Sequence, residues 1–359
     1  MNTKNAIDVR PFREEDGEAY SAFLDGHDAR LIYYSLNYKA LLEDTLGCRS
    51  EYWLAIKGER VVGILPVMAR EGPFGRVLNS LPFFGSHGGV LASDDTASWV
   101  LLAKFEELAS GPDVATATMV ENVFQPLDHP PDHDFQDDRI GQVSSLGPFG
   151  GPENEAFGRL TSIIRNRIRK ARSEGVSVAI DNDAMGCLES LHRENMAAIG
   201  GTPKPAAFFA GLGRHFRPGR DYNIFVAERG AEKIAALLVF YFGRTVEYVI
   251  PATRTKARTY QPMELIVWTA LRDAAEGGFS HWNWGGTWRS QTGVHRFKRK
   301  WGATEHVYRY FVKVNNQDVM RAAPDELLAG YPYFYTIPFD RLHGVGSDVE
   351  SLVDNQTSG

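Results

Sequence analysis

The sequence predicts an α/β (α+β) protein of two tandem domains, each with a mixed central sheet flanked by helices. A chain of 359 residues is too long for one typical domain and long enough for two that each bury a core. Both halves contain one pattern, in which two strands joined by a short charged turn precede a further strand and a long helix. The repeat indicates an internal duplication. We expect domains over residues 1–150 and 151–315, with the tail 316–359 packed on the first.

The first copy is expected within residues 1–150. The segment WLAIKGERVVGILPV contains two apolar runs separated by the charged residues 57–60, which is typical of a β-hairpin. Segments with apolar residues at helical spacing precede and follow this hairpin. We therefore predict strands near residue 7 and over 52–56, 61–69 and 114–120, and helices over 14–26, 34–46 and 93–110.

A Gly- and Pro-rich segment over 147–154 is the predicted domain boundary, because both residue types stop helices and strand ladders. Beyond it, the segment IFVAERGAEKIAALLVF repeats the hairpin pattern. We predict helices over 155–173, 185–200, 205–216 and 261–276, and strands over 222–228, 233–242, 245–251, 281–284 and 304–314.

Composition limits the classes of function. Hydrophobic residues make up 43% and charged residues 23% of the chain, as in ordinary globular proteins. A net charge of -6 disfavours a broad DNA-binding surface, because affinity for phosphates requires many positive charges. The N-terminus lacks the apolar region of a signal peptide, and the longest apolar run, 234–242, is too short for a membrane span. We expect a cytoplasmic protein.

Neither a metal site nor a disulfide is expected. Cys48 and Cys187 are far apart in the sequence and lack the spacing of metal ligands. The acidic segment 128–138 contains histidines that could bind a metal, but its paired prolines and irregular spacing favour a solvated loop. No redox or other permanently bound cofactor is indicated.

The strongest candidate for a functional site is the segment from His281 to Ala303. Its aromatic strand ends at Gly285 and Gly286, where a ligand could pass close to the backbone because no Cβ is present. In the basic helix that follows, Lys298 is placed to reach back over the strand end and stabilise a developing negative charge. A solvated basic helix end is the alternative.

Five segments of the chain resemble the motifs of one family, in the same order. They are SLPFFGSHGGVLA, IRNRIRKARSEGV, GGTPKPAAFF, YQPMELIVWTALRDAAEGG and WNWGGTWRSQTGVHRFKRKWGA. Over nearly its whole length the chain is similar to the FemA/FemB/FemX aminoacyltransferases, a tandem-repeat branch of the GCN5-related N-acetyltransferase (GNAT) superfamily. The resemblance implies two tandem GNAT-like domains and an acyltransferase activity.

The resemblance also implies roles by position. It places Phe297 and Lys298 beside the reacting acyl group, where Lys298 would steady the oxyanion or the leaving oxygen. The loop 84–89 corresponds to the acceptor-side loop of the family. His87 in this loop could take the proton of the attacking amine, because an imidazole titrates near neutral pH. A hydrogen-bonded structural histidine is the alternative.

A basic helix after the domain boundary corresponds to the helix that contacts a phosphorylated acceptor in the family, which implicates Arg165, Arg169 and Lys170. The spacing of this helix points the same way. Arg165, Arg169 and Arg172 form one charged stripe without matched acids on that face, which favours phosphate binding over a solvated surface. The residues predicted to face inward are Ile164, Ile168 and Ala171.

The chain departs from the family pattern at two places. GNAT enzymes hold the pyrophosphate of coenzyme A with a glycine-containing loop, whereas residues 254–260 contain no glycine. Only side chains such as those of Arg254 and Arg258 could hold phosphates there. Asn283 replaces the usual acidic residue before the glycine pair. The resemblance and the flanks of the site add further candidate binding residues, which are Lys39, Tyr248, Tyr260, Gly285, Gly286 and His295.

Together these features predict an N-acyltransferase. We expect an amine to attack an activated acyl carbonyl directly, with aminoacyl-tRNA or acyl-CoA as co-substrate and charged tRNA as a partner in the first case. The acceptor is expected to be a small phosphorylated or nucleotide-linked amine, such as a cell-wall precursor. The alternatives are an acyl-CoA-dependent N-acetyltransferase of polysaccharide or natural-product biosynthesis and a non-catalytic ligand-binding module. The general base and the oligomeric state stay open.

Overall fold

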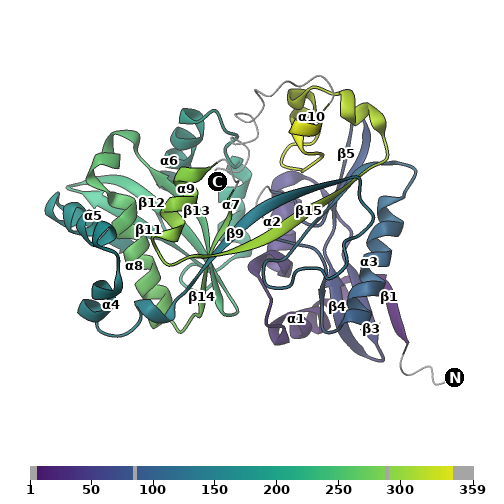
Figure 1. Ribbon diagram of the computed structural model, residues 1–359, viewed down its shortest axis with the longest axis horizontal. Coiled ribbons are helices and arrows are strands. Elements are labelled where there is room, and N and C mark those ends of the chain that lie inside the picture. Colours follow the sequence, from purple (N-terminus) through teal and green to yellow (C-terminus); the bar gives the residue numbers. More distant parts are fainter. Residues whose placement is uncertain (1–5, 84–86, 288–290, 343–359) are drawn as a thin grey trace. The chain divides into compact units, whose positions relative to one another are not determined.

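The computed structural model describes residues 6–83, 87–287 and 291–342, which fall into two compact units (Figure 1). Unit 1 contains the described residues up to Arg139 and again from Val307, and unit 2 contains Ile140–His306. Helices flank the sheets, so the predicted α/β fold class is confirmed. No described helix is both long and apolar enough to cross a membrane.

The boundary between the units falls inside two long strands, β9 (Phe135–Ser145) and β15 (Thr304–Val314). Each strand begins in one unit and ends in the other. The segment 147–154, which we expected to be the linker, lies within unit 2 and forms η4 (Gly147–Phe149) and the start of α4 (Glu153–Arg159). Its glycines and prolines end β9 rather than separating two domains.

Unit 2 contains a mixed sheet in the order β10-β11-β12-β13-β14-β9. Neighbouring strands are antiparallel except β13 and β14, which run parallel because a helix connects them. The strands are β10 (Val176–Ile180), β11 (Tyr222–Arg229), β12 (Glu232–Phe242), β13 (Thr245–Thr253) and β14 (His281–Thr287).

Four of the longer helices of unit 2 cover its sheet. On one face, α5 (Ser162–Ser173) and α8 (Pro262–Glu276) share a core with the strands. The predicted inward face of α5 is confirmed, since Ile164, Ile168 and Ala171 are fully buried. The opposite face of the sheet receives α6 (Met185–Ala198) and α7 (Ala206–His215). There Phe240 of β12 packs on Phe216, which follows α7, whereas the adjacent Val239 belongs to the first core.

Unit 1 contains two sheets, in the orders β1-β3-β4-β7 and β15-β8-β6-β5-β2. The predicted hairpin is confirmed, since β3 and β4 are antiparallel and joined by the turn at residues 57–60. The elements are α1 (Gly17–Gly26), α2 (Leu36–Leu46), α3 (Asp95–Ala109), α10 (Pro324–Gly330), β1 (Ile7–Pro11), β2 (Arg49–Ser50), β3 (Trp53–Lys57), β4 (Arg60–Leu65), β5 (Met68–Gly72), β6 (Gly75–Asn79), β7 (Leu91–Ala92) and β8 (Val114–Val120).

Three sequence-based expectations were wrong in detail. The expected helix over 155–173 is two helices, because α4 ends at Arg159 and Thr161 begins α5 as its N-cap through its side chain. The expected strand over 61–69 is split into β4 and β5 at Pro66, which has no N–H for a ladder. The expected solvated loop over 128–138 ends in the first residues of β9. Buried Arg139 pairs there with Asp137 at 2.5 Å, so the charges are neutralised within a strand.

Candidate active site

Two neighbouring strands of unit 2 separate partway along their length. β13 and β14 pair at Thr245–Glu247 against His281–Asn283, and the ladder contains no later pair in the described residues. β13 nevertheless continues to Thr253, while β14 forms a bulge against β9 between Asn283 and Gly286. The strands therefore diverge at their carboxyl ends, which is where open α/β sheets commonly bind ligands.

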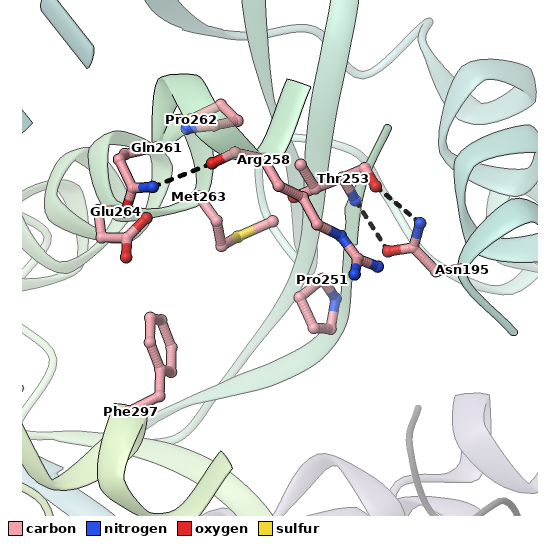
Figure 2. A pocket seen from close by; sticks show the side chains of 9 residues that line it. All are labelled: Asn195, Pro251, Thr253, Arg258, Gln261, Pro262, Met263, Glu264 and Phe297. Carbon is pink, nitrogen blue, oxygen red and sulfur yellow. Dashed lines mark hydrogen bonds between the residues drawn. The ribbon is translucent and has the colours of Figure 1, made fainter. Parts of the chain in front are cut away.

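A cavity of about 340 Å³ lies at the end of β13 (Figure 2). Its walls come from β13, from η5 (Thr255–Tyr260), from the start of α8, from α6 and from α9 (Thr292–Arg299). Figure 2 shows Phe297 of α9 on the other side of the cavity from Met263 and Arg258. The residues that line it are Asn195, Pro251, Thr253, Arg258, Gln261, Pro262, Met263, Glu264 and Phe297.

Side-chain amides hold the backbone around this cavity. Asn195 donates from Nδ2 to the carbonyl of Thr253 at 2.7 Å, and its Oδ1 accepts from the Thr253 amide at 3.0 Å (Figure 2). Gln261 lies in the left-handed region at φ 59°, which turns the chain from η5 into α8, and its Nε2 donates to the carbonyl of Arg258. Asn195 therefore fixes the last residue of β13 to α6, and Gln261 fixes the turn from η5 into α8.

An ion pair with a buried carboxylate lies at the start of α8. The carboxylate of Glu264, which lines the cavity, accepts from Nη1 of Arg167 on α5 at 2.5 Å. The side chain of Glu264 is only 9% exposed. A carboxylate in the first turn of a helix is favoured by the helix dipole, and the guanidinium neutralises most of its charge. This end of the cavity consequently offers a paired carboxylate rather than a free helix N-terminus.

Lys298 turns inward, as expected for a lysine that reaches back over the strand end. It is 4% exposed, and its Nζ donates to Thr287 Oγ1 at 2.7 Å and to the carbonyls of Gly286 at 3.1 Å and Gly285 at 3.5 Å. Burial disfavours the charged form and lowers the pKa of Lys298 from 10.5 to about 7. The alternative, a solvated helix end, does not describe this residue.

The acceptors of Lys298 are themselves held in place. The hydroxyl of Thr287 donates to Oε1 of Gln142 on β9 at 3.1 Å, and both side chains are fully buried. Asn283 Oδ1 accepts from the amide of Gly285 at 3.0 Å, which stabilises the bulge at Gly285, where φ is 71°. A left-handed φ of this kind is available to glycine without strain. The glycine pair and Lys298 therefore form one hydrogen-bonded unit.

Replacing Thr287 with valine is expected to lower the pKa of Lys298 further, because the ammonium loses its shortest acceptor while the buried volume is retained. The measurement is an NMR titration of the lysine side chains, with Lys298 assigned by substitution. Thr287→Ser keeps the hydroxyl and is the matched control. Equal pKa values for Lys298 in the valine and serine variants would contradict this account.

Aromatic rings fill the space between the diverging strands. Tyr248 follows the last paired residue of β13, and its ring centroid lies 5.0 Å from that of Trp284 on β14. Trp284 in turn contacts Phe297 at 6.0 Å, and its Nε1 donates to Ser144 Oγ at 2.8 Å. Burial raises the pKa of Tyr248, so its phenol stays protonated at neutral pH. These rings connect the strand opening to the wall of the cavity.

The arginines of the basic stripe on α5 have partners within the protein that their spacing in the sequence did not predict. Arg165 Nη1 donates to the carbonyls of Leu160 at 2.5 Å and Gly158 at 3.0 Å. Arg169 lies over the ring of Phe157, 5.4 Å from its centroid, and Lys170 is exposed. Arg172 pairs with Glu153 at 2.8 Å. The expectation that no acid matches this stripe was wrong, because α4 folds Glu153 onto it. Phosphate binding by Arg165, Arg169 and Lys170 stays a prediction.

The remaining candidates lie in varied surroundings. In unit 2, Arg254 is paired with Glu232 at 2.9 Å, whereas Arg258 lines the cavity. Tyr260 lies under the guanidinium of Arg229 at 4.2 Å, and His295 Nε2 lies 2.9 Å from Glu305. In unit 1, Lys39 forms an ion pair with Glu43 at 2.9 Å. Among these residues, the structure brings only Arg258 to the cavity that Phe297 lines.

His87 belongs to unit 1 and is fully buried. Its Nδ1 lies 3.3 Å from the carbonyl of Glu121, and its ring packs edge-on against Tyr308 at 4.6 Å and Tyr33 at 6.1 Å. This burial favours the alternative interpretation of His87, a hydrogen-bonded structural histidine. Proton transfer by His87 stays a prediction and would require the surrounding side chains to open. Residues 84–86 of the same loop lie outside the described residues.

Several residues of the site were not found from the sequence. Gln142 lies in β9, a strand that we did not predict because charged residues occupy its first half. Glu264 and Arg167 are nearly a hundred residues apart in the sequence, so their ion pair could not be predicted from local patterns. Asn195 gave no local signal, because an asparagine within a helix is unremarkable until its backbone partner is known. Pro262 stands at the first helical position of α8, where proline is favoured, and this signal could have marked the start of that helix and hence this wall of the cavity.

Known proteins resemble the chain at the level of a domain and of the fold. Residues 159–299 match the model of an acetyltransferase (GNAT) domain, a segment that lies wholly within unit 2. No curated protein matched the sequence. Among the described residues, no group of three or more His, Cys, Asp and Glu side chains could hold a metal ion.

Solved structures extend the likeness to both units. The crystal structure of FemX aligns with a TM-score of 0.66 and 12% identity, covering 87% of this chain and 98% of that one. The C-terminal domain of a putative lysylphosphatidylglycerol synthetase from Agrobacterium fabrum aligns with a TM-score of 0.57 and 12% identity. This alignment covers 90% of this chain and 99% of that one. A tandem GNAT protein from the clavulanic acid biosynthesis pathway aligns with a TM-score of 0.52 and 13% identity. This alignment covers 86% of this chain and 98% of that one.

At such identities these structures establish the fold alone, whereas the matched domain model identifies the kind of enzyme. The divergent strands, the cavity at the start of α8 and Lys298 all lie within the matched segment. Residues 159–299 therefore form an acetyltransferase domain of the GNAT type within a fold similar to that of FemX, and the protein is an acyltransferase.

Proposed function

We propose that this acyltransferase moves an aminoacyl or acyl group from an activated donor to an amine of a phosphorylated or nucleotide-linked acceptor. The observation that carries the proposal is the buried Lys298, which is held by the glycine pair of β14 where β13 and β14 diverge. The adjacent residue, Phe297, lines the cavity at the end of β13. A buried ammonium at such a place stabilises developing negative charge without reorganisation of water.

The proposed reaction is direct attack. The lone pair of the acceptor nitrogen adds to the acyl carbonyl, the carbonyl oxygen becomes an oxyanion, and its collapse expels the thiolate or ribose oxygen of the donor. The proton released from nitrogen passes to the leaving group through water or through a side chain that acts as general base. Of the three acceptors of Lys298, the carbonyl of Gly285 is the most distant at 3.5 Å. The N–H directed to it is the one most easily released to an oxyanion.

Aminoacyl-tRNA is our first candidate for the donor, and acyl-CoA is the second. The resemblance to the FemA/FemB/FemX group supports the first. The absence of glycine from η5 adds to that support, because a pyrophosphate is commonly held by the backbone amides of a glycine-containing loop at this place. Arg258 and the likeness to a tandem GNAT protein favour the second. We place the reaction in the cytoplasm, in the biosynthesis of the cell envelope.

A direct comparison of donors tests the proposal. The purified protein is incubated with an amino-sugar nucleotide and either acetyl-CoA or a mixture of charged tRNAs, and the product is identified by mass spectrometry. We expect an amide product with charged tRNA and little release of free thiol with acetyl-CoA. Thiol release with amide formation would favour the second donor. If neither donor acylates any amine in a panel, the protein is the non-catalytic binding module and the proposal is wrong.

A further inference from the structure

A second cavity of unit 2, with a volume of about 260 Å³, shares no lining residue with the first. It lies between the segment after β9, the start of α5 and the end of α9. Three of its residues are basic and none is acidic. The residues that line it are Ser145, Pro148, Phe149, Ala156, Arg159, Leu160, Thr161, Arg299, Lys300, Trp301 and Gly302.

The positive charges at this cavity are only weakly compensated. Arg159 donates from Nη1 to the carbonyls of Pro148 at 3.1 Å and Gly150 at 3.5 Å, which fix its guanidinium beside the cavity. The carboxylates nearest to Arg159 and Arg299 lie at 3.8 Å, beyond hydrogen-bond distance, and all four side chains are substantially exposed. For Lys300, the described residues offer no carboxylate within ion-pair distance. Such long, exposed pairs contribute little free energy and leave the cations available to a ligand.

Two further features favour an anion. Thr161, which lines the cavity, is the N-cap of the 12-residue helix α5, so the positive end of a helix dipole is directed toward it. Trp301 also lines the cavity, and its buried Nε1 has no acceptor among the described residues. An oxyanion bound nearby would be a candidate acceptor for this N–H. Phe149 and Leu160 supply an apolar wall, as in sites that hold a phosphate attached to an organic group.

We propose that this second cavity binds a phosphate or diphosphate group through Arg159, Arg299, Lys300 and the N-terminus of α5. Its position connects it to the first cavity, because Trp301 contacts Phe297, which lines the first one, at a ring distance of 6.4 Å. Lys298 lies between these two aromatic residues in the sequence. Binding at the second cavity requires no acyl transfer, so it can be measured independently of the proposed function.

The test measures the dissociation constant of inorganic pyrophosphate by titration calorimetry for the intact protein and two variants. Arg159→Gln and Lys300→Gln each remove one cation from the cavity, and we expect each to weaken binding by about tenfold, as for loss of one charge-assisted hydrogen bond. Arg296→Gln removes the same charge from α9 but outside the cavity, where the side chain of Arg296 donates hydrogen bonds to Thr292. We expect it to change the affinity less than about twofold.

A hairpin RNA with the sequence of a tRNA acceptor stem is titrated in parallel, to distinguish a small-molecule phosphate from a nucleic-acid phosphate. Saturable binding of either probe that weakens in both cavity variants, and not in Arg296→Gln, supports the proposal and identifies the source. Thermal unfolding of each variant confirms that it is folded. The proposal is overturned if neither probe binds, or if all three variants bind each probe equally.

Discussion

Replacement of Lys298 with methionine is expected to lower turnover by about tenfold to a thousandfold while the protein stays folded. The methionine side chain is nearly as long as that of lysine, so it retains the packing under the glycine pair but supplies no donor. Loss of one preorganised donor to an oxyanion typically has an effect of about this size. The measurement is turnover with the donor and acceptor found in the donor comparison, together with the far-UV spectrum of the variant.

The matched control is Arg296→Met on the same helix, where the lost cation is exposed and donates hydrogen bonds to Thr292. It should keep turnover within about twofold of the unmodified protein. An unchanged rate in Lys298→Met would remove this residue from the mechanism. The pH profile supplies a second check: since the pKa of Lys298 is lowered to about 7, turnover that depends on its charged form should fall as the pH rises through that value.

The same pKa has a consequence for stability. The unfolded chain keeps Lys298 protonated up to about pH 10.4, whereas the folded protein releases the proton near pH 7. Between these values the unfolded state binds more protons, so this residue makes the free energy of unfolding rise with pH. Lys298→Met should lack that contribution. Urea unfolding of both proteins at pH 6 and pH 9 measures the difference, and parallel pH dependences would contradict the assigned pKa.

Replacement of Gly88 with alanine is expected to destabilise unit 1 by about 3 kcal/mol or more, at the upper end of the range for overpacking a core. A Cβ at this position would lie 1.6 Å from the carbonyl oxygen of Ser80, which belongs to the backbone and cannot rotate away. The carbonyl of Gly88 also accepts the hydroxyl of Tyr34, so movement of the loop would break a buried hydrogen bond. The urea midpoint of unfolding measures the loss.

Gly186 in α6 provides the control, because a Cβ there would meet no atom within 4 Å. Gly186→Ala should leave stability unchanged or raise it by up to about 1 kcal/mol, through the higher helix propensity of alanine. If the two substitutions had equal effects on the urea midpoint, the close approach of Gly88 to Ser80 would not be a constraint on the fold.

The sequence by itself determined the features that depend on near neighbours in the chain. The charged turn at residues 57–60 separates two apolar runs, and the spacing of Ile164, Ile168 and Ala171 places one face of α5 inward. Both were confirmed, because turn chemistry and helical periodicity act over a few residues. Lys298 was singled out for the same reason, since a basic residue in a helix after a glycine pair is a local pattern.

Only the tertiary structure decided which groups meet. β9 and β15 run through both units, a path that no local pattern encodes, and Gln142 of β9 thereby reaches Thr287. Glu153 neutralises an arginine of α5 that appeared unmatched in the sequence. The pKa of Lys298 likewise depends on the removal of water by distant segments. Periodicity and turn propensity are short-range properties, whereas burial, ion pairing and pKa arise from contacts between residues far apart in the chain.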